Sequence, residues 1–230
     1  MSLPLLLTPR QAAAFLDHTL LAPDATAEAV EVLCAEAVAH GFKAVCVNPW
    51  HLPRVAACLA GELPLPITVA GFPLGASQTA AKAREAGLAV EQGAAEVDMV
   101  LNIGALKGGD ADAVRRDVAE VVRACAGRPV KVILETCLLA DAEKELACRL
   151  CVEAGAAFVK TSTGFSRSGA SEADVALMRR VVGPHTGVKA SGGIRSAADM
   201  LRMLAAGADR IGASAGVAIV KEFSQAGGGI

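Results

Sequence analysis

Residues 155–193 read GAAFVKTSTGFSRSGASEADVALMRRVVGPHTGVKASGG, and this stretch decides the fold class. A short apolar run at 156–160 is followed by a polar loop, a helix-like segment between Ser171 and Gly183, and a second apolar run at 186–190. Two short strands joined by a helix favour parallel pairing, because the chain must return to the edge where it started. The stretch therefore predicts one β/α unit of a parallel sheet.

The same unit recurs along the whole chain. Eight strand-like runs occur at 15–21, 43–47, 67–70, 96–101, 130–135, 156–160, 186–190 and 209–212. Helical segments between them span 26–41, 77–92, 111–126, 141–155, 171–183 and 196–207, and a last helix begins near Ala213. Several helices end at glycine, which suits a left-handed C-terminal position, at Gly41, Gly93, Gly155 and Gly207.

Eight such units predict an α/β protein with a closed (β/α)8 TIM barrel, preceded by a short N-terminal helix. The alternative is an open doubly wound sheet, but no Gly-x-Gly-x-x-Gly follows the first strand. No linker divides the chain, so we expect residues 1–230 to form a single barrel domain, with residues 225–230 as a mobile tail.

Composition limits the classes of partner. The formal charge is −2, which gives no support for nucleic-acid or anionic-membrane binding, since both require a basic surface. The apolar N-terminal stretch is too short for a signal sequence, and we expect a cytoplasmic protein. Seven cysteines are scattered, and the Cys148–Cys151 pair has no second pair nearby, so we expect reduced, packed thiols and no metal site.

Polar residues gather where the predicted strands end, which is the edge that holds the active site in barrels. They are Asp17, His18, Asn48, Asp98, Asn102, Glu135, Thr136, Lys160 and Lys189. Lys131 stands instead at the start of its strand, and we expect it to be solvated at the opposite rim.

Lys160 and Lys189 lie on neighbouring strands, and adjacent strands are about 4.8 Å apart. Two ammonium groups about 6 Å apart would repel by roughly 3 kcal/mol at an effective dielectric of about 20, which is about two pKa units. With burial added, one amine can become neutral and attack a carbonyl while the other activates it. These arguments leave open which lysine is the nucleophile, although Lys160 follows the more apolar strand.

We expect Asp98 to transfer protons to and from an iminium intermediate, directly or through water. The alternative for these three residues is a structural ion pair at the barrel mouth. Cys46 is expected as a buried thiol and His18 as a hydrogen-bonded histidine at the rim. Glu135 is expected to join a charge network without a direct catalytic role.

Glycine-rich loops give a second signal. Ser191-Gly-Gly193 follows the seventh strand, and Gly212-Ala-Ser-Ala-Gly216 follows the eighth and leads into a helix. Loops at these positions form the phosphate site of many barrels, and Thr163-Gly164 can join them. The alternative is that the glycines only serve tight turns.

Six motifs together resemble deoxyribose-phosphate aldolase, and they run in order from about residue 10 to 220. They are Leu16-Asp-His-Thr-Leu-Leu21, Val45-Cys-Val-Asn-Pro49, Gly71-Phe-Pro-Leu-Gly75, Glu96-Val-Asp-Met-Val-Leu-Asn102, Val159-Lys-Thr-Ser-Thr-Gly-Phe165 and Val188-Lys-Ala-Ser-Gly-Gly-Ile-Arg195. The resemblance implies a class I aldolase without a cofactor or metal, active in deoxynucleoside catabolism. It would cleave 2-deoxy-D-ribose 5-phosphate reversibly into D-glyceraldehyde 3-phosphate and acetaldehyde.

The resemblance also implies residue roles and a homodimer or homotetramer. Lys160 would form the Schiff base, Lys189 would lower its pKa, Asp98 would be the general acid and base, and Asp17 would support the proton network. The sugar site would contain Thr19, Cys46 and Thr163, and the phosphate site Gly164, Gly192, Gly193, Gly212 and Ser214.

Some positions depart from the family pattern. The chain has no tyrosine, whereas some members end in one that assists proton transfer. Ala22 stands where lysine is common, and Ala213 and Ala215 stand where hydroxyl residues are common. Two other functions stay open: a Schiff-base aldolase with a pyruvate or dihydroxyacetone donor, and a sugar-phosphate-binding protein that kept the fold.

Overall fold

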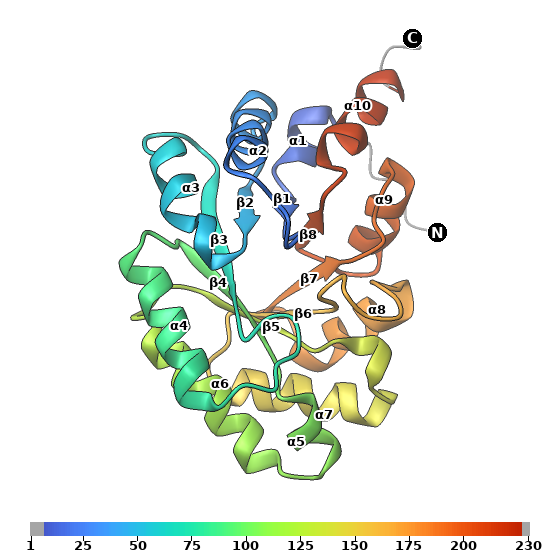
Figure 1. Ribbon diagram of the computed structural model, residues 1–230. Coiled ribbons are helices and arrows are strands. Elements are labelled where there is room, and N and C mark those ends of the chain that lie inside the picture. The colour runs from blue at the N-terminus through green and yellow to red at the C-terminus, as the bar shows by residue number, and fades with distance from the viewer. Residues whose placement is uncertain (1–6, 227–230) are drawn as a thin grey trace.

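The computed structural model describes residues 7–226, which form a closed barrel of parallel strands (Figure 1). Each strand pairs with the next along the chain, and β8 closes onto β1. The strands are β1 (Leu16–Leu20), β2 (Ala44–Val47), β3 (Leu65–Ala70), β4 (Glu96–Val100), β5 (Val130–Ile133), β6 (Phe158–Lys160), β7 (Gly187–Ser191) and β8 (Arg210–Ala213). The predicted (β/α)8 barrel is confirmed.

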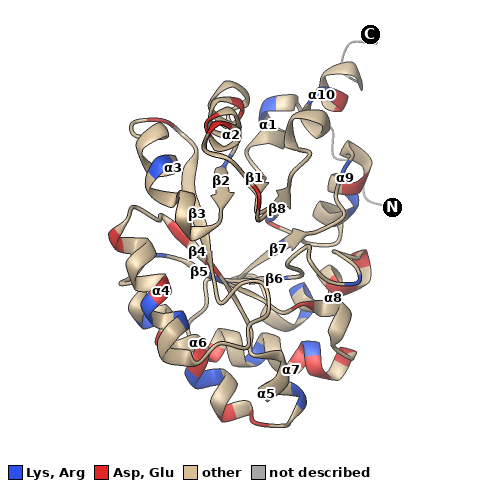
Figure 2. Cartoon of the chain, in the orientation of Figure 1, with Lys and Arg blue, Asp and Glu red and all other residues tan. Residues whose placement is uncertain are grey.

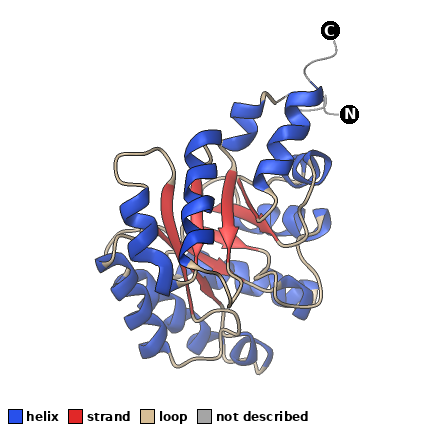
Figure 3. Cartoon of the chain, turned by 45° about the horizontal axis from the view of Figure 1, so that its top comes forward, coloured by secondary structure: helices blue, strands red, loops and turns tan. Residues whose placement is uncertain are grey.

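Helices surround the strands on the outside (Figure 3). They are α1 (Pro9–Ala13), α2 (Ala27–His40), α3 (Leu52–Cys58), α4 (Thr79–Glu91), α5 (Ile103–Lys107), α6 (Ala111–Ala124), α7 (Asp141–Glu153), α8 (Glu172–Val182), α9 (Ala197–Ala205) and α10 (Gly216–Ala226). The expected short N-terminal helix is α1. No helix in residues 7–226 is long and apolar enough to cross a membrane.

Local sequence explains the helix boundaries. The Thr26 hydroxyl accepts a hydrogen bond from the Ala29 N–H and begins α2, and Gly41 ends it at a φ of 69°. Ser196 and Asp199 form a capping box at the start of α9. Such end signals are short-range, which is why these boundaries agree with the sequence prediction.

The structure adds elements that the sequence did not indicate. The helix α3, a 3-10 turn at Pro49–His51, the helix α5 and a second 3-10 turn at Thr136–Leu138 all lie in loops after strands. They are one or two turns long, too short for an apolar period to repeat. Of the predicted tail, Gln225 and Ala226 belong to α10, and 227–230 lie outside the described residues.

The apolar core lies between the outer face of the barrel and the helices, where residues such as Val97, Val132 and Val188 are fully buried. Inside the barrel, Leu21, Ala44, Cys46, Ile67 and Val69 form a separate apolar cluster. Charged side chains share the interior with this cluster and with Val100 and Ile133, which have the same strand parity as Asp98 and Lys131. Figure 2 shows charge both on the outer helices and on the strands at the centre of the barrel.

Candidate active site

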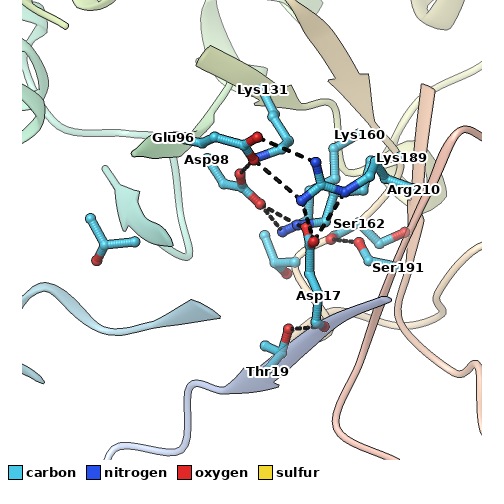
Figure 4. Close-up of polar contacts among 12 residues, drawn as sticks. Asp17, Thr19, Glu96, Asp98, Lys131, Lys160, Ser162, Lys189, Ser191 and Arg210 are labelled. Carbon is cyan, nitrogen blue, oxygen red and sulfur yellow. Dashed lines mark hydrogen bonds and ion pairs between the residues drawn. The ribbon is translucent and has the colours of Figure 1, made fainter. Parts of the chain in front are cut away.

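Strand register places the charged residues beside one another inside the barrel (Figure 4). Lys160 on β6 pairs in register with Lys189 on β7, and Lys189 pairs with Arg210 on β8. Asp98 on β4 is in register with Lys131 on β5. Residues in register on parallel strands point to the same face, so these five side chains share the interior.

Asp98 lies at the centre of this group. Its Oδ2 accepts hydrogen bonds from Lys160 Nζ at 2.9 Å and Lys189 Nζ at 2.8 Å, and its Oδ1 accepts one from Lys131 Nζ at 2.8 Å. Burial raises the pKa of Asp98, but the charges of Lys131, Lys160 and Lys189 outweigh burial and hold the pKa well below its ordinary value. Asp98 is therefore a carboxylate at neutral pH.

Asp17 holds Lys189 from the other side, with 2.5 Å between Lys189 Nζ and Asp17 Oδ2. Arg210 donates to Asp17 Oδ1 through Nε at 3.1 Å and also through Nη2. Burial alone would lower the pKa of Lys189, but Asp17 and Asp98 raise it above its ordinary value. Lys189 is therefore a fixed cation.

Lys131 is not solvated at the opposite rim, so that prediction is wrong. It is fully buried, with Nζ 2.5 Å from Glu96 Oε2 in addition to its bond to Asp98. Glu96 also accepts from Arg210 at 3.3 Å. A flexible four-carbon side chain near the start of a strand can point up the barrel, and two carboxylates offset the cost of burying its charge.

The charges of this network do not balance. Four cationic side chains face three carboxylates, and they are Lys131, Lys160, Lys189 and Arg210 with Asp17, Glu96 and Asp98. Within residues 7–226, Lys160 alone among the four contacts a single carboxylate, and it shares that one with two other lysines. Each of the others contacts two.

Lys160 is therefore the cation whose proton is least well held. Burial lowers its pKa, Asp98 raises it, Lys189 lowers it again, and the result is a pKa below the ordinary value of lysine. Loss of this proton leaves three cations against three carboxylates. The choice between the two lysines, which the sequence left open, thus favours Lys160 as the neutral amine.

Lys160 borders a cavity of about 380 Å³ at the mouth of the barrel. The cavity is lined by residues at the ends of β1, β6, β7 and β8 and in the loops that follow them: Thr19, Leu21, Ala22, Pro23, Lys160, Thr163, Gly164, Phe165, Ser191, Gly192, Gly193, Ile194, Arg195, Gly212, Ala213 and Ser214. The structure therefore brings Thr19, Thr163 and all five predicted phosphate-site residues to one cavity with Lys160.

The glycine loops pack closely against one another. Gly192 has a φ of 86°, and a Cβ there would lie 2.9 Å from the Gly169 Cα. The Ser191 hydroxyl donates to the Ser162 carbonyl at 2.6 Å and ties the loop after β7 to the loop after β6. Backbone at this end of the cavity is held in place by these contacts, and it is accessible because glycine has no side chain.

Two predicted residues lie elsewhere in the barrel. Cys46 is fully buried within the apolar interior cluster and does not line the cavity, and burial raises the pKa of its thiol to about 11. His18 Nε2 lies 2.7 Å from Glu36 Oε2. Burial lowers the pKa of His18 more than Glu36 raises it. The ring is hydrogen-bonded, as the sequence indicated, but it is buried on the outer face of β1 against Phe42 and does not lie at the rim.

Sequence reasoning missed several buried charges. Arg210 and Glu96 were placed on strands without a role, although a charged residue in an apolar run was the signal available. Lys82 and Asp117, which pair at 2.7 Å between α4 and α6, look like ordinary surface positions of helices in the sequence. In residues 7–226 no three His, Cys, Asp or Glu side chains gather in a group that could hold a metal ion.

The fold and site together define an enzyme-type barrel with an amine of lowered pKa at the edge of a cavity. The chain belongs to the DeoC/LacD aldolase family, because the sequence model of that family matches residues 11–225. It is 60% identical to the deoxyribose-phosphate aldolase of Rhodospirillum rubrum, over 93% of this chain and 90% of that one. It is 55% identical to that of Brevibacillus brevis, over 94% and 97%.

A solved structure of similar shape is the tetrameric deoxyribose-phosphate aldolase of Aeropyrum pernix. Its TM-score to this chain is 0.89 at 36% identity, with 95% of this chain and 93% of that chain covered. The protein is therefore an aldolase, a lyase that acts on carbon–carbon bonds.

Proposed function

We propose that this protein is a class I aldolase that reversibly cleaves 2-deoxy-D-ribose 5-phosphate to D-glyceraldehyde 3-phosphate and acetaldehyde through a Schiff base on Lys160. The observation that carries the proposal is the charge imbalance: Lys160 has the smallest share of the carboxylates, and it borders the cavity. The names of the relatives in Rhodospirillum rubrum and Brevibacillus brevis supply the substrate.

The first steps form the Schiff base. The neutral Lys160 amine attacks the C1 carbonyl of the open-chain sugar and gives a carbinolamine. The carbinolamine takes up one proton from solvent and loses water, which leaves an iminium ion. The iminium restores a positive charge close to Asp98 Oδ2, which already accepts from Lys160 in the free enzyme. The site therefore stabilises the intermediate with groups that do not have to move.

The next steps break the carbon–carbon bond. Asp98, ionised because of its low pKa, accepts the proton of the C3 hydroxyl directly or through one water. The C2–C3 electron pair moves into the iminium and gives an enamine and glyceraldehyde 3-phosphate. Protonation at C2 and hydrolysis then release acetaldehyde and return Lys160.

The remaining residues of the site tune the pKa of Lys160 or bind the substrate. Lys189 lowers the pKa of Lys160 by its fixed charge, and Asp17 keeps Lys189 charged. Thr19 and Thr163 line the cavity beside the sugar, and Cys46 contributes to the apolar wall of the barrel behind it. Backbone of Gly164, Gly192, Gly193, Gly212 and Ser214 binds the phosphate.

The test is borohydride trapping with 2-deoxyribose 5-phosphate, followed by peptide mass mapping. We expect a reduced adduct on Lys160 and none in Lys160→Ala. An adduct on Lys189 would keep the reaction class and reverse the two lysine roles. If no adduct forms and no acetaldehyde is released, the proposed reaction is wrong.

We also propose that the protein works as a homodimer or homotetramer, because the Aeropyrum pernix relative is described as tetrameric. Light scattering on the purified protein measures the mass directly. A mass near 23 kDa, that of one chain, would contradict this proposal.

A further inference from the structure

Glu135 stands out in the part of the chain that the structure describes because of its backbone. It has a φ of 55°, and within residues 7–226 the only other non-glycine residue with a positive φ is Ala126. This left-handed region favours glycine, and side chains adopt it at a cost. Strained residues of this kind gather at functional sites when the surrounding structure holds them there.

The Glu135 side chain is buried, yet among the described residues it has no cationic partner within ion-pair distance. Its partners are the backbone N–H of Thr163, at 3.3 Å from Oε1, and the Thr163 hydroxyl, which donates to Oε2. The Cys137 thiol is a more distant donor, with Sγ 3.9 Å from Oε1. A buried acid without a cation is costly, and these hydrogen bonds, most of them from Thr163, are its compensation. Thr163 is therefore the main partner of this strained and buried residue.

Thr163 connects Glu135 to the turn at Gly164. Its hydroxyl proton is committed to Glu135, and its oxygen in turn accepts the N–H of Phe165 at 3.0 Å. The two bonds enclose Gly164, whose φ is 87° and which lines the cavity between Thr163 and Phe165. The conformation of this turn thus depends on an acceptor at Glu135.

We propose that Glu135 is a positioning residue that acts through Thr163 and holds the Gly164 turn in the shape that binds the phosphate end of the substrate. This inference rests on the proposed function, because it assigns one end of the same cavity to a phosphate. It does not place Glu135 in contact with the substrate.

The role predicts a selective kinetic defect. In Glu135→Gln the side chain keeps its size but loses one acceptor oxygen, so the turn loosens. We expect KM for 2-deoxyribose 5-phosphate to rise about tenfold or more. Cleavage of unphosphorylated 2-deoxyribose should change by less than about threefold, since it makes no use of the phosphate end.

Matched variants separate positioning from folding. Thr163→Val removes the hydroxyl and should reproduce the defect, whereas Thr163→Ser keeps it and should resemble the wild type. Combined with Glu135→Gln, Thr163→Val should add little, because both changes remove one interaction. Glu135→Gly relieves the backbone and should fold well while keeping the KM defect. Glu36→Gln, which removes the carboxylate of α2 that contacts His18 and does not line the cavity, is the control.

Two outcomes would overturn the inference: an unchanged KM for the phosphorylated sugar in Glu135→Gln and Glu135→Gly, or equal losses with both substrates. Failure of the proposed function looks different, because the wild type would then cleave neither sugar. In that event calorimetric titration with inorganic phosphate still decides the role of Glu135. Weaker binding in Glu135→Gly than in the wild type supports it, and equal binding or no binding to either contradicts it.

Discussion

At the scale of single residues, the site depends on how three carboxylates are divided among four cations. Lys189, Lys131 and Arg210 each contact two carboxylates, and Lys160 contacts one. A difference in pKa between chemically identical lysines follows from this division, with Lys160 lowered and Lys189 raised. Removing any one cation should therefore change the proton affinity of Lys160.

Lys131→Met tests this at a residue that does not border the cavity. A charge about 7 Å away contributes roughly 2 kcal/mol at an effective dielectric of about 20. Its loss makes the protonated form of Lys160 easier to keep, so the pKa of Lys160 rises. We expect the acid limb of the kcat/KM profile to move up by about one pH unit or more.

The control is Lys107→Met, which removes an exposed lysine that pairs with Glu143 and makes no contact with the network. Its pH profile should match that of the wild type. A profile for Lys131→Met that coincides with the wild type, in protein that remains folded, would rule out Lys131 as a determinant of the pKa of Lys160.

At the scale of elements, the cavity depends on how closely the strands and their loops approach. Gly212 on β8 faces the interior, and a Cβ there would lie 3.0 Å from the Ser191 Cβ and 3.1 Å from the Lys189 Cε. Lys189 is held by contacts of 2.5 and 2.8 Å and has little room to shift. A methyl group at this position should disturb the site more than the fold.

Gly212→Ala is therefore expected to lower kcat about tenfold or more while it lowers the unfolding free energy by only about 1–2 kcal/mol. Steady-state kinetics and urea denaturation measure the two effects. Gly104→Ala in α5 is the matched control, because its Cβ meets only an ordinary contact of 3.7 Å. A Gly212→Ala enzyme with wild-type kcat would show that Ser191 and Lys189 can accommodate the added methyl group.

Outside the barrel, the helices α4 and α6 are joined by a buried ion pair between Lys82 and Asp117. Lys82 also donates to the Val100 carbonyl at 3.0 Å, and Thr79 donates to Asp117 at 2.9 Å. Lys82→Met leaves an unpaired buried carboxylate and should cost about 3–5 kcal/mol of unfolding free energy. The double variant Lys82→Met/Asp117→Leu should recover much of this loss in urea denaturation, and no recovery would contradict a simple ion pair.

At the scale of the whole molecule, the barrel encloses its charges in a shell of apolar residues. Asp98 and Asp17 have folded pKa values below the ordinary value, so the unfolded chain binds protons more readily than the folded one. Their contribution to stability is complete above the unfolded pKa of about 4 and is lost as the pH falls toward the folded pKa.

We therefore expect the unfolding free energy to fall steeply below about pH 4. Asp98→Asn lacks one of these groups, so its deficit relative to the wild type should be largest near pH 7 and shrink in acid. Urea denaturation of both proteins between pH 7 and 3 measures this. A deficit that stays constant over the range would show that Asp98 does not titrate with unfolding.

Local signals made much of this molecule predictable. Helix ends at Thr26, Gly41 and Ser196 depend on neighbours a few residues away, and the eight strand-like runs predicted the barrel whose strands carry Lys160, Lys189 and Asp98. Strand order follows from chain order in such a barrel. Lys160, Lys189 and Asp98 meet inside the barrel for that reason, whereas Cys46 belongs to the apolar cluster of the interior.

What the sequence by itself determined was the repeating unit, the barrel and the set of chemical groups at its mouth, because these depend on period and position along the chain. Only the tertiary structure decided the direction of Lys131, the partners of Arg210 and Glu96, and the division of carboxylates that marks Lys160. Side chains that are up to 193 positions apart in the sequence meet inside the barrel, as Asp17 and Arg210 do. A pKa depends on all the charges within a few ångströms, so it is a property of that three-dimensional arrangement.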